Sequence, residues 1–182
     1  LSIGAPTVLV MLCSFSVVSV QTAASYSFSE SGPSILAYAR LWFTLPYAFL
    51  AVPITTTMFT ELAEMQAEGN TQGVKRGIVS GTNQILFFMI PFALYLMVFA
   101  LPLVTLYHAG AFTMESVSAI ASYLAVLAVA LPFYGVNTYL QKVYSSVRKM
   151  GVFAAFNFVA GAAQVALTMF GASHAESFPI EI

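Results

Sequence analysis

The sequence contains very little charge. Only 7% of its 182 residues are Asp, Glu, Lys or Arg, whereas 59% belong to the apolar and aromatic set. A soluble domain carries about 25% charged residues, so this chain has too little charge to cover a water-facing surface. The formal net charge of −1 also gives no electrostatic basis for binding nucleic acid, and no nucleic-acid partner is expected.

The residues that support acid–base, nucleophilic and metal chemistry are scarce as well. The sequence contains no Asp, and no Glu falls inside a long apolar run. Its one cysteine, Cys13, excludes an internal disulfide and a cysteine-only metal site. His108 and His174 are isolated and form no ligand set. We therefore expect no catalytic residue, no metal site and no cofactor, and no intramembrane carboxylate of the kind that ion-coupled transport uses.

Long apolar runs are what the sequence has in quantity. A helix of about 20 residues crosses a hydrocarbon core of about 30 Å, and lipid offers no partner for an unpaired backbone N–H or C=O. The runs predict one partial transmembrane domain over residues 1–182. Its predicted helices cover residues 3–24, 35–60, 80–106, 117–140 and 151–172. The predicted fold class is an all-α polytopic membrane helix bundle with about five transmembrane helices.

The basic residues predict the orientation of this bundle. Five of the six follow the second and the fourth predicted helix: Lys75, Arg76, Lys142, Arg148 and Lys149. The remaining connections contain no Lys or Arg. By the positive-inside rule, the loops 61–79 and 141–150 are cytoplasmic, with the N-terminus inside and the C-terminus outside.

The sixth basic residue, Arg40, lies inside the second predicted helix, about 8 Å along the axis from its outer end. Two interpretations stay open. Arg40 either extends to the outer headgroups as an anchor beside Tyr38 and Trp42, or it faces a cavity and binds an anionic substrate. The planar guanidinium suits phosphate because it donates two parallel hydrogen bonds, and an intramembrane charge favours a functional role.

Two further sets of residues inside the predicted helices have structural and functional interpretations. Candidate hinges are the prolines, each of which removes an intrahelical hydrogen bond: Pro46, Pro53, Pro91 and Pro132. Candidate cavity residues are the amides, which otherwise bond neighbouring helices: Gln21, Asn137, Asn157 and Gln164.

Four segments together resemble a known family: residues 36–55, 68–76, 110–113, and the end of the fourth predicted helix with its basic exit, 140–149. The first contains a Tyr-Ala-Arg run followed by Leu-Pro-Tyr-Ala, which resembles the tyrosine–alanine run ahead of a proline in the MurJ/MviN family of lipid II flippases. The second is similar to the family's cytoplasmic loop, and the third to its outer Gly-Ala-Phe turn. The family often has Asp-Arg after Tyr-Ala, whereas Arg40 directly follows Ala39 here.

The resemblance implies the two-lobed fold of the multidrug/oligosaccharidyl-lipid/polysaccharide exporter superfamily, with these helices starting the second lobe. It implies a transporter of the bacterial plasma membrane, which is not an enzyme. The transported lipid would be lipid II, an undecaprenyl-pyrophosphate-linked sugar–peptide, moved by alternating access, and Arg40 would neutralise its pyrophosphate. Expected partners are this lipid, membrane lipids, the missing first lobe and cell-wall synthesis proteins.

Three alternatives remain open from the sequence. The first is a polysaccharide-repeat or multidrug exporter of the same fold. The second is a membrane enzyme acting on polyprenyl phosphates, which the lack of convergent acid–base residues disfavours. The third is a non-transporting scaffold for cell-wall synthesis, which the kinked helices and Arg40 disfavour.

Overall fold

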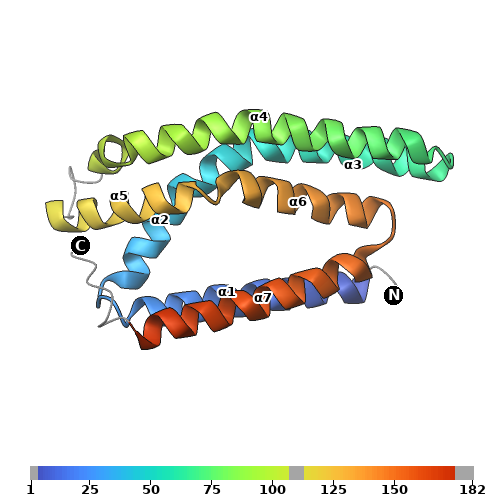
Figure 1. The fold of residues 1–182 in the computed structure, drawn as a ribbon. Helices are drawn as coiled ribbons and strands as arrows, with labels where there is room; N and C mark the ends of the chain where they lie inside the picture. The colour runs from blue at the N-terminus through green and yellow to red at the C-terminus, as the bar shows by residue number, and fades with distance from the viewer. Residues whose placement is uncertain (1–3, 107–112, 175–182) are drawn as a thin grey trace. The chain divides into compact units, whose positions relative to one another are not determined.

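The computed structural model describes residues 4–106 and 113–174, and within these ranges every regular element is a helix (Figure 1). The elements are α1 (Gly4–Ser25), α2 (Gly32–Pro46), the π-helix η1 (Tyr47–Ala51), α3 (Val52–Ala67), α4 (Thr71–Val104), α5 (Met114–Ala128), α6 (Leu131–Ser146) and α7 (Met150–Ser173). The predicted all-α class is confirmed. The predicted outer turn around His108 and Gly110, and the residues after His174, lie outside the described residues.

Four helical stretches are long and apolar enough to cross a membrane: Gly4–Ser25, Gly32–Ala67, Thr71–Val104 and Met150–Ser173. The pair α5 and α6 makes a fifth if the two helices form one broken span, bent by 54°. The chain is therefore a multi-pass membrane protein, as predicted. The side of the membrane on which each terminus lies stays a prediction.

The chain divides into two compact units. The terminal unit comprises the described residues up to Ala37 together with those from Lys149 onward, and the central unit comprises Tyr38–Arg148. In the terminal unit, α1 and α7 lie side by side (Figure 1). A Cβ built on Gly161 of α7 would lie 2.5 Å from the Cys13 sulfur of α1, so glycine permits this close approach.

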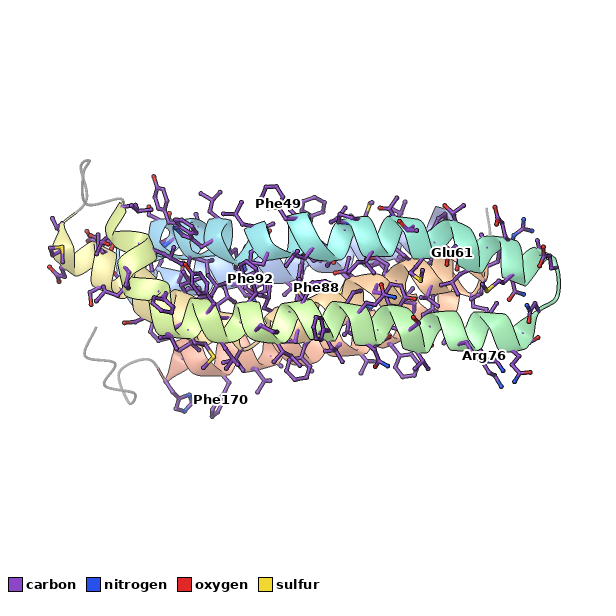
Figure 2. The ribbon with its side chains drawn as sticks, turned by 90° about the horizontal axis from the view of Figure 1, so that it is seen from above. Phe49, Glu61, Arg76, Phe88, Phe92 and Phe170 are labelled. Atoms are coloured by element: carbon purple, nitrogen blue, oxygen red, sulfur yellow. The ribbon has the colours of Figure 1, made fainter. Side chains whose placement is uncertain are left out.

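In the central unit, α4 packs against α3, α5 and α6. Its buried residues are spaced by seven positions once and then by three or four, so they form one stripe: Val74, Gly81, Ile85, Met89, Ala93, Leu96, Ala100 and Val104. The other faces of α4 are apolar but exposed, with Phe87 and Val98 each 72% exposed. Figure 2 labels Phe88 and Phe92 along the same helix, and Arg76 near the end at which α3 joins α4. Such large exposed apolar surfaces suit lipid as the surrounding solvent.

The second predicted span is helical from Gly32 to Ala67, but its backbone is irregular in the middle. Pro46 ends α2 and the π-helix η1 follows directly, while Pro53 lies in the first turn of α3. Proline lacks the N–H that a regular helix needs at these positions. π-Helical turns are rare overall, and those that occur are often found at functional sites. The Thr55 hydroxyl donates to the Ala51 carbonyl at 2.6 Å, which satisfies the last carbonyl of η1.

The fourth predicted span, expected as one helix over 117–140, consists of two helices, α5 and α6. Pro132 lies in the first turn of α6. Because proline cannot donate to the carbonyl four residues earlier and its ring crowds that carbonyl, a helix break before Pro132 is favourable. By contrast, α4 continues through Pro91 and Pro102 without a break. Whether any of the four candidate prolines acts as a hinge stays a prediction.

Candidate substrate-binding face

Arg40 lies in α2, within the central unit, and is half-buried. It follows Gly32, the first residue of α2, by eight positions, which is about 12 Å along the helix axis. Its neighbour Ala39 is fully buried and Phe43, one turn later, is buried as well. The Arg40 carbonyl accepts a hydrogen bond from the Thr44 hydroxyl at 2.7 Å, so the backbone here is a regular helix and only the guanidinium is unusual for a membrane span.

The Arg40 guanidinium interacts electrostatically with the Tyr123 hydroxyl of α5. The two residues are far apart in the sequence and come from two different spans, so the fold brings them together. A phenol oxygen can accept a hydrogen bond from a guanidinium and can also donate one. The interaction therefore joins a cation of the second span to a hydroxyl of the fourth, both within the predicted hydrocarbon region.

The irregular middle of the second span meets α6 through an aromatic cluster. The Tyr134 ring of α6 lies edge-on to Phe43 of α2, with ring centroids 5.4 Å apart, and edge-on to Tyr47 of η1, at 5.0 Å. The Thr138 side chain, one turn after Tyr134, hydrogen-bonds with the Tyr47 hydroxyl. Edge-to-face aromatic pairs stabilise a contact by about 0.5–1.5 kcal/mol beyond area burial, so the cluster fixes η1 against α6.

The other predicted polar residues are divided between the two units. Asn137 lies in α6 of the central unit and is exposed. Gln21 lies in α1, and Asn157 and Gln164 lie in α7, all within the terminal unit. The Asn157 amide donates to the Phe153 carbonyl of its own helix at 3.4 Å. A cavity formed jointly by these amides and Arg40 therefore stays a prediction.

Sequence reasoning missed four residues through which the second span interacts with the pair α5 and α6: Tyr47, Tyr123, Tyr134 and Thr138. One usable signal was present, since Tyr123 and Tyr134 are polar residues 11 positions apart within one apolar run. Eleven residues are close to three helical turns, which would place both hydroxyls on one face of an unbroken helix. The contacts with α2 and η1, in contrast, depend on tertiary packing, which the spacing does not encode.

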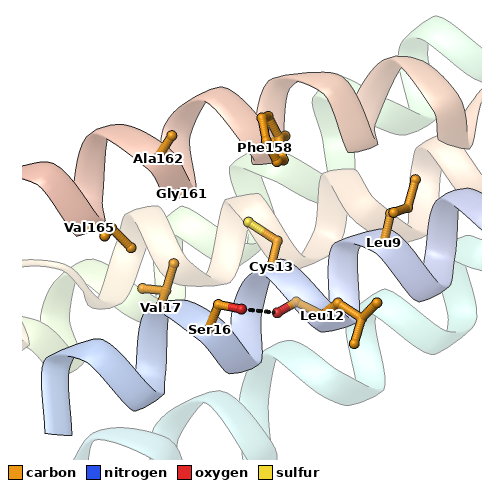
Figure 3. A pocket seen from close by; sticks show the side chains of 9 residues that line it. All are labelled: Leu9, Leu12, Cys13, Ser16, Val17, Phe158, Gly161, Ala162 and Val165. Atoms are coloured by element: carbon orange, nitrogen blue, oxygen red, sulfur yellow. Dashed lines mark hydrogen bonds between the residues drawn. The ribbon is translucent and has the colours of Figure 1, made fainter. Parts of the chain in front are cut away.

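An apolar groove of about 330 Å³ runs between α1 and α7 (Figure 3). It is lined by Leu9, Leu12, Cys13, Ser16, Val17, Phe158, Gly161, Ala162 and Val165. The only hydroxyl among them, from Ser16, donates to the Leu12 carbonyl at 2.9 Å, and the Cys13 thiol donates to the Asn157 carbonyl at 3.6 Å. Without a charge or an available donor, this groove does not suit an anion.

The first turns of α4 carry a shallow basic hollow of about 600 Å³. It is lined by Gln72, Lys75, Arg76, Val79, Ser80 and Asn83. These side chains come from a single helix end and lie where the positive-inside rule places the cytoplasmic headgroups. We therefore expect this charge to contact lipid headgroups. Among the described residues, no three His, Cys, Asp or Glu side chains are close enough to hold a metal ion.

Comparison with known proteins gives consistent matches. The family model described as "Lipid II flippase MurJ" matches residues 2–174. The probable lipid II flippase MurJ of Borreliella burgdorferi is 23% identical over 169 residues, which cover 90% of this chain and 33% of that protein. The lipid II flippase MurJ of Thermosipho africanus is 26% identical over 114 residues, covering 62% of this chain and 23% of that protein. The chain thus spans about a third or less of these relatives. No solved structure shows significant similarity to it.

Proposed function

Because the chain belongs to the MurJ family of lipid II flippases, we propose that it is part of a transporter that moves lipid II across the bacterial plasma membrane. The match of the family model to residues 2–174 is the observation that carries this proposal. The transported lipid is an undecaprenyl-pyrophosphate-linked sugar–peptide. Since the chain spans about a third of the relatives' length, the remaining helices belong to other parts of the same protein, including the first lobe.

In this proposal the protein breaks no bond and instead lowers the barrier to moving a charged headgroup through hydrocarbon. An isolated ion transferred to a medium of low dielectric constant loses tens of kcal/mol of solvation on the idealised Born estimate. Arg40 offsets part of this loss, because its guanidinium donates two parallel hydrogen bonds to a phosphate group. Its position about 12 Å from the first residue of α2 supports this role, because the cation then lies within the helix and not at its end.

The alternatives fit the residues less well. An exporter of cationic drugs would favour a carboxylate in its cavity, whereas the sequence contains no Asp and its predicted spans contain no Glu. An exporter of polysaccharide repeats on a polyprenyl-pyrophosphate carrier has the same anionic chemistry as lipid II. It is therefore the second candidate, and only the identity of the transported lipid separates the two.

The test uses the full-length parent protein reconstituted in lipid vesicles with fluorescent lipid II in the inner leaflet. We expect lipid II to become accessible to a membrane-impermeant quencher faster than in protein-free vesicles. A transporter of another polyprenyl-linked glycan would leave lipid II in place and move its own carrier lipid. An enzyme would change the mass of the lipid, and a scaffold would move no lipid at all, so either result would contradict the proposal.

A further inference from the structure

The two irregular spans of the central unit approach one another along a row of polar and aromatic side chains. On the first span, Phe43 and Tyr47 follow Arg40 by three and seven residues, which places all three on one helical face. On the second span, Tyr123 interacts electrostatically with Arg40, and Tyr134 lies against both Phe43 and Tyr47. The row therefore runs in the same order along both spans, beginning at Arg40.

Two tyrosines of this row are partly exposed, with Tyr123 at 37% and Tyr134 at 43%. In the bent pair α5 and α6, Tyr123 lies nine residues after Met114, the first residue of α5, and Tyr134 lies twelve residues before Ser146, the last residue of α6. Both positions are well inside this apolar broken span, whereas membrane tyrosines usually lie in the interfacial belts at the ends of a span. A hydroxyl exposed to hydrocarbon is costly, so this face suits a polar environment.

We propose that Tyr123 and Tyr134 form a sugar-binding subsite next to Arg40, which receives the carbohydrate of the lipid headgroup while Arg40 binds its pyrophosphate. The inference rests on the proposed function and adds the residues that recognise the sugar. Sugar hydroxyls both donate and accept hydrogen bonds, as a phenol does, and the apolar ring of tyrosine packs against the C–H face of a sugar. The neutral hydroxyls add no charge, so they recognise the sugar and leave the anion to Arg40.

The packing explains how the subsite keeps its shape. The hydrogen bond between Thr138 and Tyr47 and the edge-on contacts of Tyr134 fix α6 against η1. On the adjacent face of α6, Gly135 permits close contact with α4, because a Cβ there would lie 3.0 Å from Ile85 and 3.2 Å from Met89. The Tyr134 ring is therefore held by its neighbours, and its exposed part is presented in one orientation.

The experiment measures binding of two lipids to the purified full-length parent: undecaprenyl pyrophosphate, which has no sugar, and lipid II, which carries two. Tyr123→Phe and Tyr134→Phe remove only the hydroxyl and keep the ring contacts. Each should weaken lipid II binding about 3- to 10-fold, the loss of one hydrogen bond, and leave undecaprenyl pyrophosphate binding unchanged. Arg40→Ala should weaken the binding of both lipids.

Tyr95→Phe in α4 is the matched control, since Tyr95 is 44% exposed and its ring stacks on Phe99 at 5.0 Å, outside the row. It should leave the binding of both lipids unchanged. Tyrosine variants that bind lipid II as tightly as the parent would overturn the subsite. An equal loss of affinity for both lipids would overturn it too, because the tyrosines would then act only through Arg40 and not on the sugar. A parent protein that binds neither lipid would contradict the proposed function itself.

Discussion

Arg40 is the residue on which the proposed intramembrane anion site depends. A guanidinium inside a membrane span costs about 2.5–3.5 kcal/mol at the helix centre on insertion scales. Arg40 lies eight residues, about 12 Å along the helix axis, after Gly32, the first residue of α2. A headgroup anchor remains the alternative role, and the proposed interpretation is that Arg40 binds the substrate anion.

This interpretation predicts the behaviour of Arg40 variants in the full-length parent. Arg40→Ala should abolish or strongly reduce rescue of cell-wall synthesis in a flippase-depleted strain, at matched membrane levels. Arg40→Lys should restore only part of the activity, because an ammonium keeps the charge but loses the two-pronged geometry. Insertion of the Ala variant should not suffer, since removing an intramembrane charge lowers the transfer cost.

Leu41→Ala is the neighbouring control. Leu41 is exposed on the same turn of α2, and truncating it tests whether any change near Arg40 disturbs the helix. We expect Leu41→Ala to retain activity. Full activity with Lys at position 40 would assign Arg40 to the headgroup anchor, because lysine reaches the interface equally well.

Among the elements, the pair α1 and α7 depends on one small residue. Gly161→Ala would bring a Cβ to 2.5 Å from the Cys13 sulfur, a distance that requires the helices to separate or the thiol to rotate. Overpacking of this kind costs about 1–3 kcal/mol. We therefore expect Gly161→Ala to lower the thermal stability of the purified full-length parent, measured by the temperature at which it unfolds in detergent.

Two further variants isolate the cause. Gly171 lies on the same helix, and a Cβ there would meet nothing within 4 Å. Gly171→Ala should therefore leave the stability unchanged or raise it, since alanine favours the helix. Cys13→Ala combined with Gly161→Ala should recover most of the loss, because it removes the clashing sulfur. A loss of equal size at both glycines would point to backbone effects instead of helix packing.

The arrangement of elements was predictable from the sequence to the extent that it depends on the length of apolar runs. Each of the five predicted runs coincides with a long helix or with the bent pair α5 and α6. Pro132 was a candidate hinge, but the sequence could not show that the helix breaks there while α4 passes through Pro91 unbroken, because neighbouring helices decide whether a proline interrupts a span. The π-helix after Pro46 was missed for a similar reason, since its extra residue leaves no mark in the hydrophobic pattern.

The candidate site was predictable only at Arg40, which its charge identifies. In the sequence, Tyr123 and Tyr134 are tyrosines within an apolar run, and so are tyrosines that pack elsewhere, such as Tyr95. What distinguishes them is contact with residues of another span, and such contacts between distant segments do not follow from helical periodicity. The structure therefore adds the partners of Arg40, whereas the sequence identifies the charge itself.

For the whole molecule, the orientation in the membrane is the first property to measure. Single cysteines should be placed at Glu30, Gln72 and Ser145, in a full-length parent with Cys13→Ala. In intact cells, a membrane-impermeant thiol reagent should label position 30 and should not label positions 72 and 145, because the basic connections remain cytoplasmic. Permeabilised cells should label all three. Labelling of positions 72 and 145 from outside would reverse the predicted orientation.

The last prediction is that residues 1–182 do not transport lipid II by themselves. The chain spans about a third or less of its relatives, and alternating access requires two parts that move against each other around a site. The row beginning at Arg40 presents the exposed rings of Tyr123 and Tyr134 at membrane depth, and hydrocarbon is a poor environment for these hydroxyls. The expressed fragment should insert into the membrane, detected by the same cysteine labelling, yet fail to rescue a flippase-depleted strain that the full-length parent rescues. Rescue by the fragment at equal membrane levels would mean that these helices, alone or as an oligomer, complete the transport path.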